Sequence, residues 1–110
     1  MQHPPEVTAR GMTLPPRLEA SLARRVEKLE RLHPRIVGCR ITVERPVRRR
    51  ETGDPYAVRV NLALAGDDVV ITRQTGETPM NAVQRAFEAA ERKLQDAARR
   101  RREFQRTPDA

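Results

Sequence analysis

Apolar residues recur at helical spacing in two segments of the chain. After the pair Pro15-Pro16, one apolar residue appears every three or four positions, in the series Leu18, Leu22, Val26, Leu29 and Leu32. A second series follows Pro79 at the same spacing: Met80, Val83, Phe87, Ala90, Leu94 and Ala97. This spacing places each series on one side of an amphipathic helix. The sequence therefore predicts one helix that ends at His33-Pro34 and a second that starts from a cap and a proline within residues 75–79.

Four other segments alternate apolar and polar residues, which is the pattern of a strand with one buried face. They are Glu6–Arg10, Ile36–Glu44, Tyr56–Leu64 and residues 69–73. In the third segment, the alternation predicts that Val58, Val60 and Leu62 point inward. The sequence Gly66-Asp67-Asp68 predicts a tight turn, and residues 45–55, with two prolines, predict a long hairpin loop.

The predicted order of elements is strand, helix, three strands, helix. Two helices can cover the apolar face of one mostly antiparallel, four-stranded sheet, which gives an α+β two-layer sandwich of β-α-β-β-β-α order. The other face of the sheet has Arg, Thr, Glu and Asn side chains and is expected to lie in water. We expect residues 1–104 to form a single domain and residues 105–110 to form a disordered C-terminal tail.

The charge balance is strongly basic, with 22 Lys and Arg against 15 Asp and Glu and a formal net charge of +7. It favours a polyanionic partner, with nucleic acid first and an acidic protein or membrane surface second. A soluble domain that is merely rich in arginine would have the same composition. No secretory signal or membrane span is visible, and a lone cysteine, Cys39, excludes an internal disulfide, so we expect a cytoplasmic protein without a membrane partner.

The cations of both predicted helices fall at spacings of three, four and seven, which form stripes on a helix surface. Arg suits a phosphate partner because its planar guanidinium presents a fork of donors and stays charged. The candidate RNA-binding residues are Arg24, Arg25, Lys28, Arg31, Arg85, Arg92, Lys93, Arg99 and Arg100. Interleaved acidic residues also fit an ordinary solvated, ion-paired surface. That alternative explains the run of four arginines at positions 99–102 poorly, because Glu103 is its one acidic neighbour.

Aromatic residues make up only 3% of the chain, and two of the three, Tyr56 and Phe87, are predicted in the core. The chain thus has no platform on which unpaired bases could stack. Recognition of the backbone and shape of structured RNA fits better. The loop residues Arg48, Arg49 and Arg50 are a second candidate contact, and a solubilising loop explains them equally well.

No motif for catalysis, a metal or a cofactor is present in the sequence. Cys39 alternates with predicted core residues, so a buried structural thiol is expected rather than a nucleophile. His33 and Cys39 do not supply the four closely spaced ligands of a zinc site. The glycines are isolated, without a phosphate-binding loop. We therefore expect neither an enzyme nor a small-molecule substrate.

Several segments match, in order, the pattern of a known family. They are Val26-Glu27-Lys28-Leu29-Glu30-Arg31, the passage from His33-Pro34 to Arg40-Ile41, Tyr56-Ala57-Val58-Arg59-Val60-Asn61-Leu62, and Ala82-Val83 to Phe87 with Arg92 and Leu94. Together they resemble the ribosome hibernation-promoting factor family, which includes the ribosome-associated inhibitor A proteins. The resemblance spans about residues 6–103. Thr78 and Met80 depart from it, because family members commonly open the last helix with an acidic residue and a nearby aromatic.

The resemblance implies a non-catalytic domain that binds the small ribosomal subunit and its rRNA at the decoding region, where mRNA and tRNA normally sit. It implies translation inhibition during ribosome hibernation and stress, and rRNA contacts for Arg25, Lys28 and Arg92. The other candidates come from helix geometry alone. The chain resembles the short form of the family, and we expect a monomer away from the ribosome. A protein-interaction adaptor and a generic binder of structured RNA are the alternatives.

Overall fold

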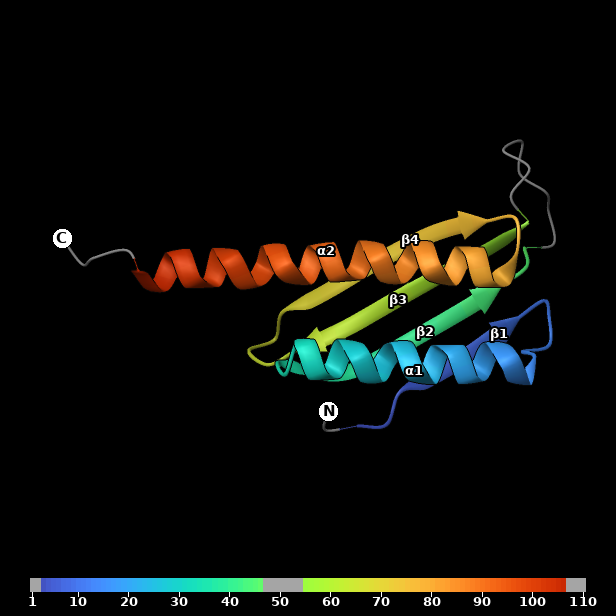
Figure 1. The fold of residues 1–110 in the computed structure, drawn as a ribbon, viewed down its shortest axis with the longest axis horizontal. Helices are drawn as coiled ribbons and strands as arrows, with labels where there is room; N and C mark the ends of the chain where they lie inside the picture. Colours follow the sequence, from blue (N-terminus) through green and yellow to red (C-terminus); the bar gives the residue numbers. More distant parts are fainter. Residues whose placement is uncertain (1–2, 47–54, 107–110) are drawn as a thin grey trace.

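The computed structural model describes residues 3–46 and 55–106, in the order predicted from the sequence (Figure 1). The elements are β1 (Glu6–Arg10), α1 (Pro16–Leu32), β2 (Ile36–Glu44), β3 (Tyr56–Leu64), β4 (Val69–Gly76) and α2 (Pro79–Arg106). The strands form one sheet in the order β1-β2-β3-β4. β1 is parallel to β2, and the other two pairs are antiparallel. The prediction of a mostly antiparallel α+β sandwich is confirmed.

The two helices lie side by side on one face of the sheet (Figure 1). The register aligns Val7 with Ile41, Ile41 with Val60, and Val60 with Thr72, so these side chains share that face. Since successive residues of a strand point to opposite faces, Arg40, Asn61 and their neighbours lie on the open face. The sheet therefore has one dry and one wet side, as the alternation predicts.

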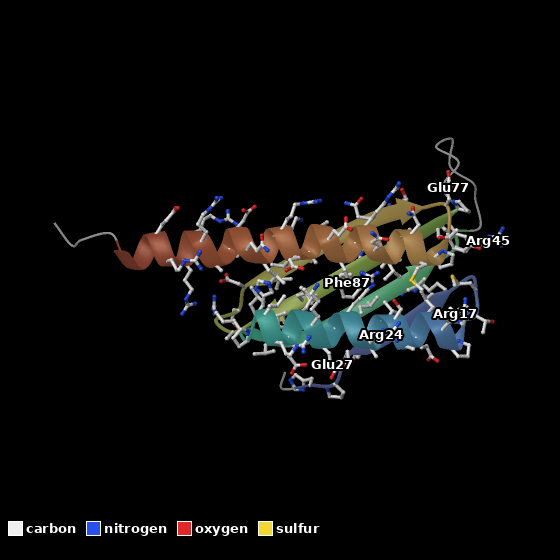
Figure 2. All side chains as sticks on the ribbon, viewed as in Figure 1. Arg17, Arg24, Glu27, Arg45, Glu77 and Phe87 are labelled. Atoms are coloured by element: carbon white, nitrogen blue, oxygen red, sulfur yellow. The ribbon has the colours of Figure 1, made fainter. Side chains whose placement is uncertain are left out.

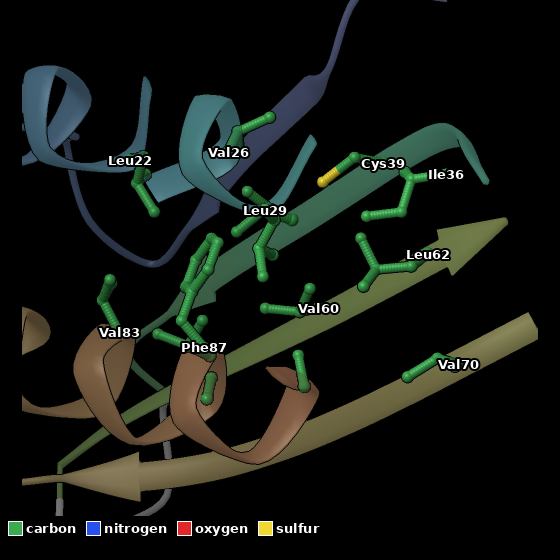
Figure 3. Packing of buried hydrophobic residues seen from close by; sticks show 14 of the residues in the cluster. Leu22, Val26, Leu29, Ile36, Cys39, Val60, Leu62, Val70, Val83 and Phe87 are labelled. Carbon is green, nitrogen blue, oxygen red and sulfur yellow. The ribbon is translucent and has the colours of Figure 1, made fainter. Parts of the chain in front are cut away.

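The core lies between the helices and the sheet (Figure 3). Leu22 and Val26 of α1 and Val83 and Phe87 of α2 are almost completely buried against the strands. Full burial of each such side chain is worth about 1.5–3 kcal/mol. One buried hydrogen bond also joins the two layers: the Thr72 hydroxyl donates to the carbonyl of Ala86 at 3.1 Å. This bond fixes α2 over β4.

The corner between β4 and α2 is tight. The amide of Asn81 donates to Oγ1 of Thr78 at 3.0 Å, so Thr78 caps the helix directly before Pro79, as the segment 75–79 predicts. A Cβ atom at Gly76 would lie 2.6 Å from the amide nitrogen of Ala82. Only glycine lets the end of β4 approach the first turn of α2 this closely.

Three details differ from the sequence prediction. β4 runs to Gly76 rather than to residue 73, because Thr75 and Gly76 still pair with β3. Leu32 is 52% exposed, since it is the last residue of α1 and borders an open pocket in front of α2. The helix α2 extends through Arg106, two residues into the segment predicted as a tail, because its charged residues continue the helix beyond the sheet.

Candidate nucleic-acid interface

The charges of α1 are separated around the helix. Arg17, Arg24 and Arg31 are seven residues apart and exposed, so they follow one line on the outer surface. Figure 2 shows Glu27 on the side of α1 that lies away from α2. Glu30 follows it by three residues and lies on that same side. The outer surface of α1 is therefore more basic than the composition of the helix suggests.

The groove between the two helices has mixed charge. It measures about 210 Å³, and α1 contributes Arg25, Lys28 and Leu29 to it. Opposite these, α2 contributes Gln84, Phe87, Glu88 and Glu91. The Arg25 guanidinium also donates to Oγ of Ser21 at 3.4 Å. The groove is therefore not a purely basic one, because its α2 side is acidic.

On α2, two of the predicted cations hold the helix to the edge strand. The Lys93 ammonium donates to the carbonyl of Ile71 at 2.7 Å, and the Arg85 guanidinium donates to the carbonyl of Thr75 at 3.0 Å. Both carbonyls belong to β4, which has no strand neighbour on that side within the described sheet. These two cations therefore satisfy backbone acceptors of the edge strand.

Arg92 and Arg99, seven residues apart and both exposed, follow one line on the surface of α2. Arg99 pairs with Asp96 at 3.3 Å, an exposed contact that is worth little in water. Among the described residues, no hydrogen bond or ion pair of Arg92 is present. Arg24, Arg31, Arg92 and Arg99 thus provide exposed charge on the surface that the two helices present to solvent.

Two further cations of the structure are not among the nine candidate RNA-binding residues. Arg35 and Arg101 lie with Lys93 and Arg100 in a separate cleft, on the β4 side of α2. Arg35 stands just after the helix break at His33-Pro34, and its neighbours in space are distant in sequence. Lys93 and Arg100 are seven residues apart, and this spacing indicates a second stripe of cations on α2. The loop residues Arg48, Arg49 and Arg50 lie outside the described residues.

The surroundings of Cys39 disfavour a nucleophilic role. Cys39 is buried in the core, and this burial raises the pKa of its thiol from 9.0 to about 11. The thiol is therefore protonated at neutral pH, which makes it a poor nucleophile. Residues 3–46 and 55–106 contain no group of three or more His, Cys, Asp or Glu side chains placed to hold a metal ion. Over the same residues, no helix has the length and apolar character needed to cross a bilayer.

The fold and sequence were compared with those of known proteins. A ribosomal subunit interface protein from Coxiella burnetii aligns with a TM-score of 0.72 and 14% identity, over 86% of this chain and 96% of that one. The N-terminal domain of Protein Y from Thermus thermophilus aligns with a TM-score of 0.66 and 12% identity, over 81% of this chain and 91% of that one. At such identities the likeness concerns the fold alone. A comparison with curated protein sequences gave no significant match.

The sequence itself matches a family model. Residues 6–102, from the start of β1 almost to the end of α2, match the model described as "Sigma 54 modulation protein / S30EA ribosomal protein". Proteins of this family are ribosome-associated and non-enzymatic, in agreement with the lack of catalytic motifs in the sequence. Because the match covers both helices and all four strands, this chain belongs to the sigma 54 modulation protein / S30EA ribosomal protein family.

Proposed function

We propose that this protein binds the rRNA of the small ribosomal subunit at the decoding region and excludes mRNA and tRNA. The observation that supports this most strongly is the exposed basic surface of the two helices. Arg24 and Arg31 on α1 and Arg92 and Arg99 on α2 all lie on the outside of the domain. In a chain of a ribosome-associated family, rRNA is the polyanion that this surface would meet.

The chemistry of the helix surface suits phosphate groups rather than bases. Guanidinium groups donate two parallel hydrogen bonds to a phosphate. A reader of single-stranded RNA would need exposed aromatic rings, and Phe87 is buried in the core. Tyr56 packs against the core, with the Arg45 guanidinium 5.6 Å from its ring centre. The geometry therefore favours recognition of the backbone and shape of folded rRNA.

The open face of the sheet is a weaker candidate for the same partner. Two of its arginines are paired with acids: Arg40 with Glu6 at 3.0 Å, and Arg73 with Glu44 at 3.9 Å. The described part of this face therefore mixes both signs of charge. The helices rather than the sheet would face the rRNA, and the open face would point away from it.

The mechanism that follows is competitive occlusion. The folded domain docks through cations of α1 and α2 on rRNA phosphates, and its volume fills the space that mRNA and tRNA need. No covalent bond is made or broken, which agrees with a non-enzymatic family. This mechanism requires a cytoplasmic protein, and a monomer is sufficient for it.

Co-sedimentation with purified small subunits at several salt concentrations tests the proposal. The test variant replaces Arg24, Arg31 and Arg92, three exposed cations of the helix surface, with Ala. The control, Arg10→Ala/Arg40→Ala/Arg59→Ala, removes the same number of charges from exposed positions on the open face. We expect the test variant to bind less tightly, and its salt slope to fall by about one unit per lost phosphate contact. The control should bind as the wild type does.

Three outcomes would contradict the proposal in different ways. Equal binding by the test variant and the wild type would show that these residues are not the contact. Binding to naked duplex RNA as tight as to small subunits would favour a generic binder of structured RNA. Retention by a protein partner after nuclease treatment would favour an adaptor.

A further inference from the structure

A basic cleft lies on the side of α2 that faces β4. It measures about 830 Å³, roughly four times the volume of the groove between the helices. Its charged lining consists of four cations and two carboxylates: Arg35, Lys93, Arg100, Arg101, Asp68 and Asp96. The cleft thus has an excess of positive charge, whereas the groove between the helices balances two cations with two carboxylates.

Two of these cations are held in place by backbone carbonyls. The Arg35 guanidinium, just before β2, donates to the carbonyl of Ala65 in the β3–β4 turn. The Lys93 ammonium donates to the carbonyl of Ile71 in β4. An ammonium has three donors and a guanidinium has five, so both cations keep donors for a ligand. Because the fold already orders these two side chains, a ligand would lose little affinity to their immobilisation.

The other two cations, Arg100 and Arg101, lie on the part of α2 that runs past the end of the sheet (Figure 1). Both are exposed, and neither has a hydrogen-bond or ion-pair partner among the described residues. One of the two carboxylates is partly neutralised, because Asp96 pairs with Arg99 at 3.3 Å. The cleft therefore combines two fixed cations with two unpaired ones.

The edge strand β4 borders the cleft along its backbone. Val69 and Ile71 of β4 line it, but they pair with Ala63 and Asn61 of β3, so their side chains, 56% and 47% exposed, point to the open face of the sheet. Four cations along one cleft match a ribose–phosphate chain, whose successive phosphate oxygens can accept hydrogen bonds from several of them. A small anion would leave most of the 830 Å³ unused.

We propose that the cleft between β4 and the overhanging end of α2 binds the phosphate backbone of a second RNA segment. This segment is distinct from the RNA on the outer surfaces of the two helices. The inference rests on the proposed function and extends it, because RNA would contact α2 on two sides. Contacts on two sides of α2 would fix the orientation of the domain on its target, whereas contacts on a single basic surface would allow the domain to rotate.

Paired charge-removal variants of the full chain test this inference. The variant Arg100→Ala/Arg101→Ala removes the two unpaired cations of the cleft and leaves Arg24, Arg31 and Arg92 of the outer helix surface in place. The control Arg10→Ala/Arg59→Ala removes two exposed charges from the open face. We expect the cleft variant to lower the salt slope of small-subunit binding by about 1.4–1.8 units, at 0.7–0.9 per phosphate contact. The control should leave the slope unchanged.

A second measurement keeps this inference separate from the proposed function. In a titration of the wild-type protein with a short RNA duplex, followed by NMR, we expect the backbone amides of Val69, Ile71 and Arg101 to shift. These shifts should disappear in the cleft variant even if wild-type protein fails to bind small subunits. Equal salt slopes for the cleft variant and wild type, without duplex-induced shifts in β4, would overturn the inference. So would a cleft-dependent complex that survives nuclease treatment, because it would identify a protein as the ligand.

Discussion

Two glycine substitutions test how closely the end of β4 approaches the first turn of α2. Gly76→Ala and Gly38→Ala make the same chemical change in two strands of one sheet. The added Cβ at position 76 would lie 2.6 Å from the amide nitrogen of Ala82 and 2.8 Å from Oδ1 of Asn81. The added Cβ at position 38 would meet one atom, Cβ of Ala63, at an ordinary 3.6 Å. Only Gly76→Ala should therefore destabilise the fold.

The expected magnitudes follow from two opposing effects. Replacing Gly with Ala restricts the unfolded chain, which stabilises the fold by about 0.4–1 kcal/mol where the site accepts the methyl group. Overpacking against neighbours that cannot move costs about 1–3 kcal/mol. At position 76 the obstacle is backbone at the first turn of α2, so the cost should outweigh the gain. Gly38→Ala should be neutral or slightly stabilising.

Urea denaturation of the wild type and both variants measures this difference. The midpoint should fall for Gly76→Ala and stay or rise for Gly38→Ala, with the same slope m in all three proteins. A destabilisation of about 1 kcal/mol corresponds to a drop in Tm of about 4–8 °C for a domain of this size. Equal midpoints for the two variants would refute the close approach of β4 to α2.

Other predictions concern single groups. Burial raises the pKa of the Cys39 thiol from 9.0 to about 11, so the folded state holds the thiol proton more tightly than the unfolded state does. The stabilisation by the protonated thiol is complete below pH 9 and is lost as the pH rises toward 11. Wild type should lose up to about 3 kcal/mol more than Cys39→Ala over that range, and parallel pH profiles of unfolding would contradict this. Thr78→Ala removes the cap of α2 and should cost about 1 kcal/mol in urea denaturation, whereas Thr78→Ser should restore most of it. Thr72→Val removes the hydroxyl bonded to the Ala86 carbonyl and should also cost about 1 kcal/mol, and an unchanged midpoint would show that this bond does not hold α2 to β4.

Much of the fold was predictable because its pattern is local. The alternation around Val58, Val60 and Leu62 specifies a strand with one buried face, and all three side chains are buried on the helix side. The spacing of Leu22, Val26 and Leu29 specifies a helix in the same way. Leu32 obeys that spacing too, yet it is half exposed, because the pocket that it borders at the end of α1 is open.

The charged surface was less predictable because each cation depends on distant neighbours. Lys93 and Arg85 look like surface cations in the sequence, but they donate to carbonyls of β4 that only the fold brings near. Arg25 and Lys28 face Glu88 and Glu91 across the interhelical groove, which no spacing within α1 indicates. Arg35 joins a cleft with residues about sixty positions away. Sequence spacing predicts the face of one helix, while these contacts require the packing of several elements.

In the proposed mechanism, the protein and the substrates of decoding exclude each other on the small subunit. Binding of labelled protein to purified small subunits, empty or preloaded with mRNA and tRNA and followed by sedimentation at moderate salt, tests this exclusion. We expect stoichiometric binding to empty subunits, and a loss of binding in proportion to the occupancy by mRNA and tRNA. Full binding of the protein to preloaded subunits, with mRNA and tRNA retained, would contradict it.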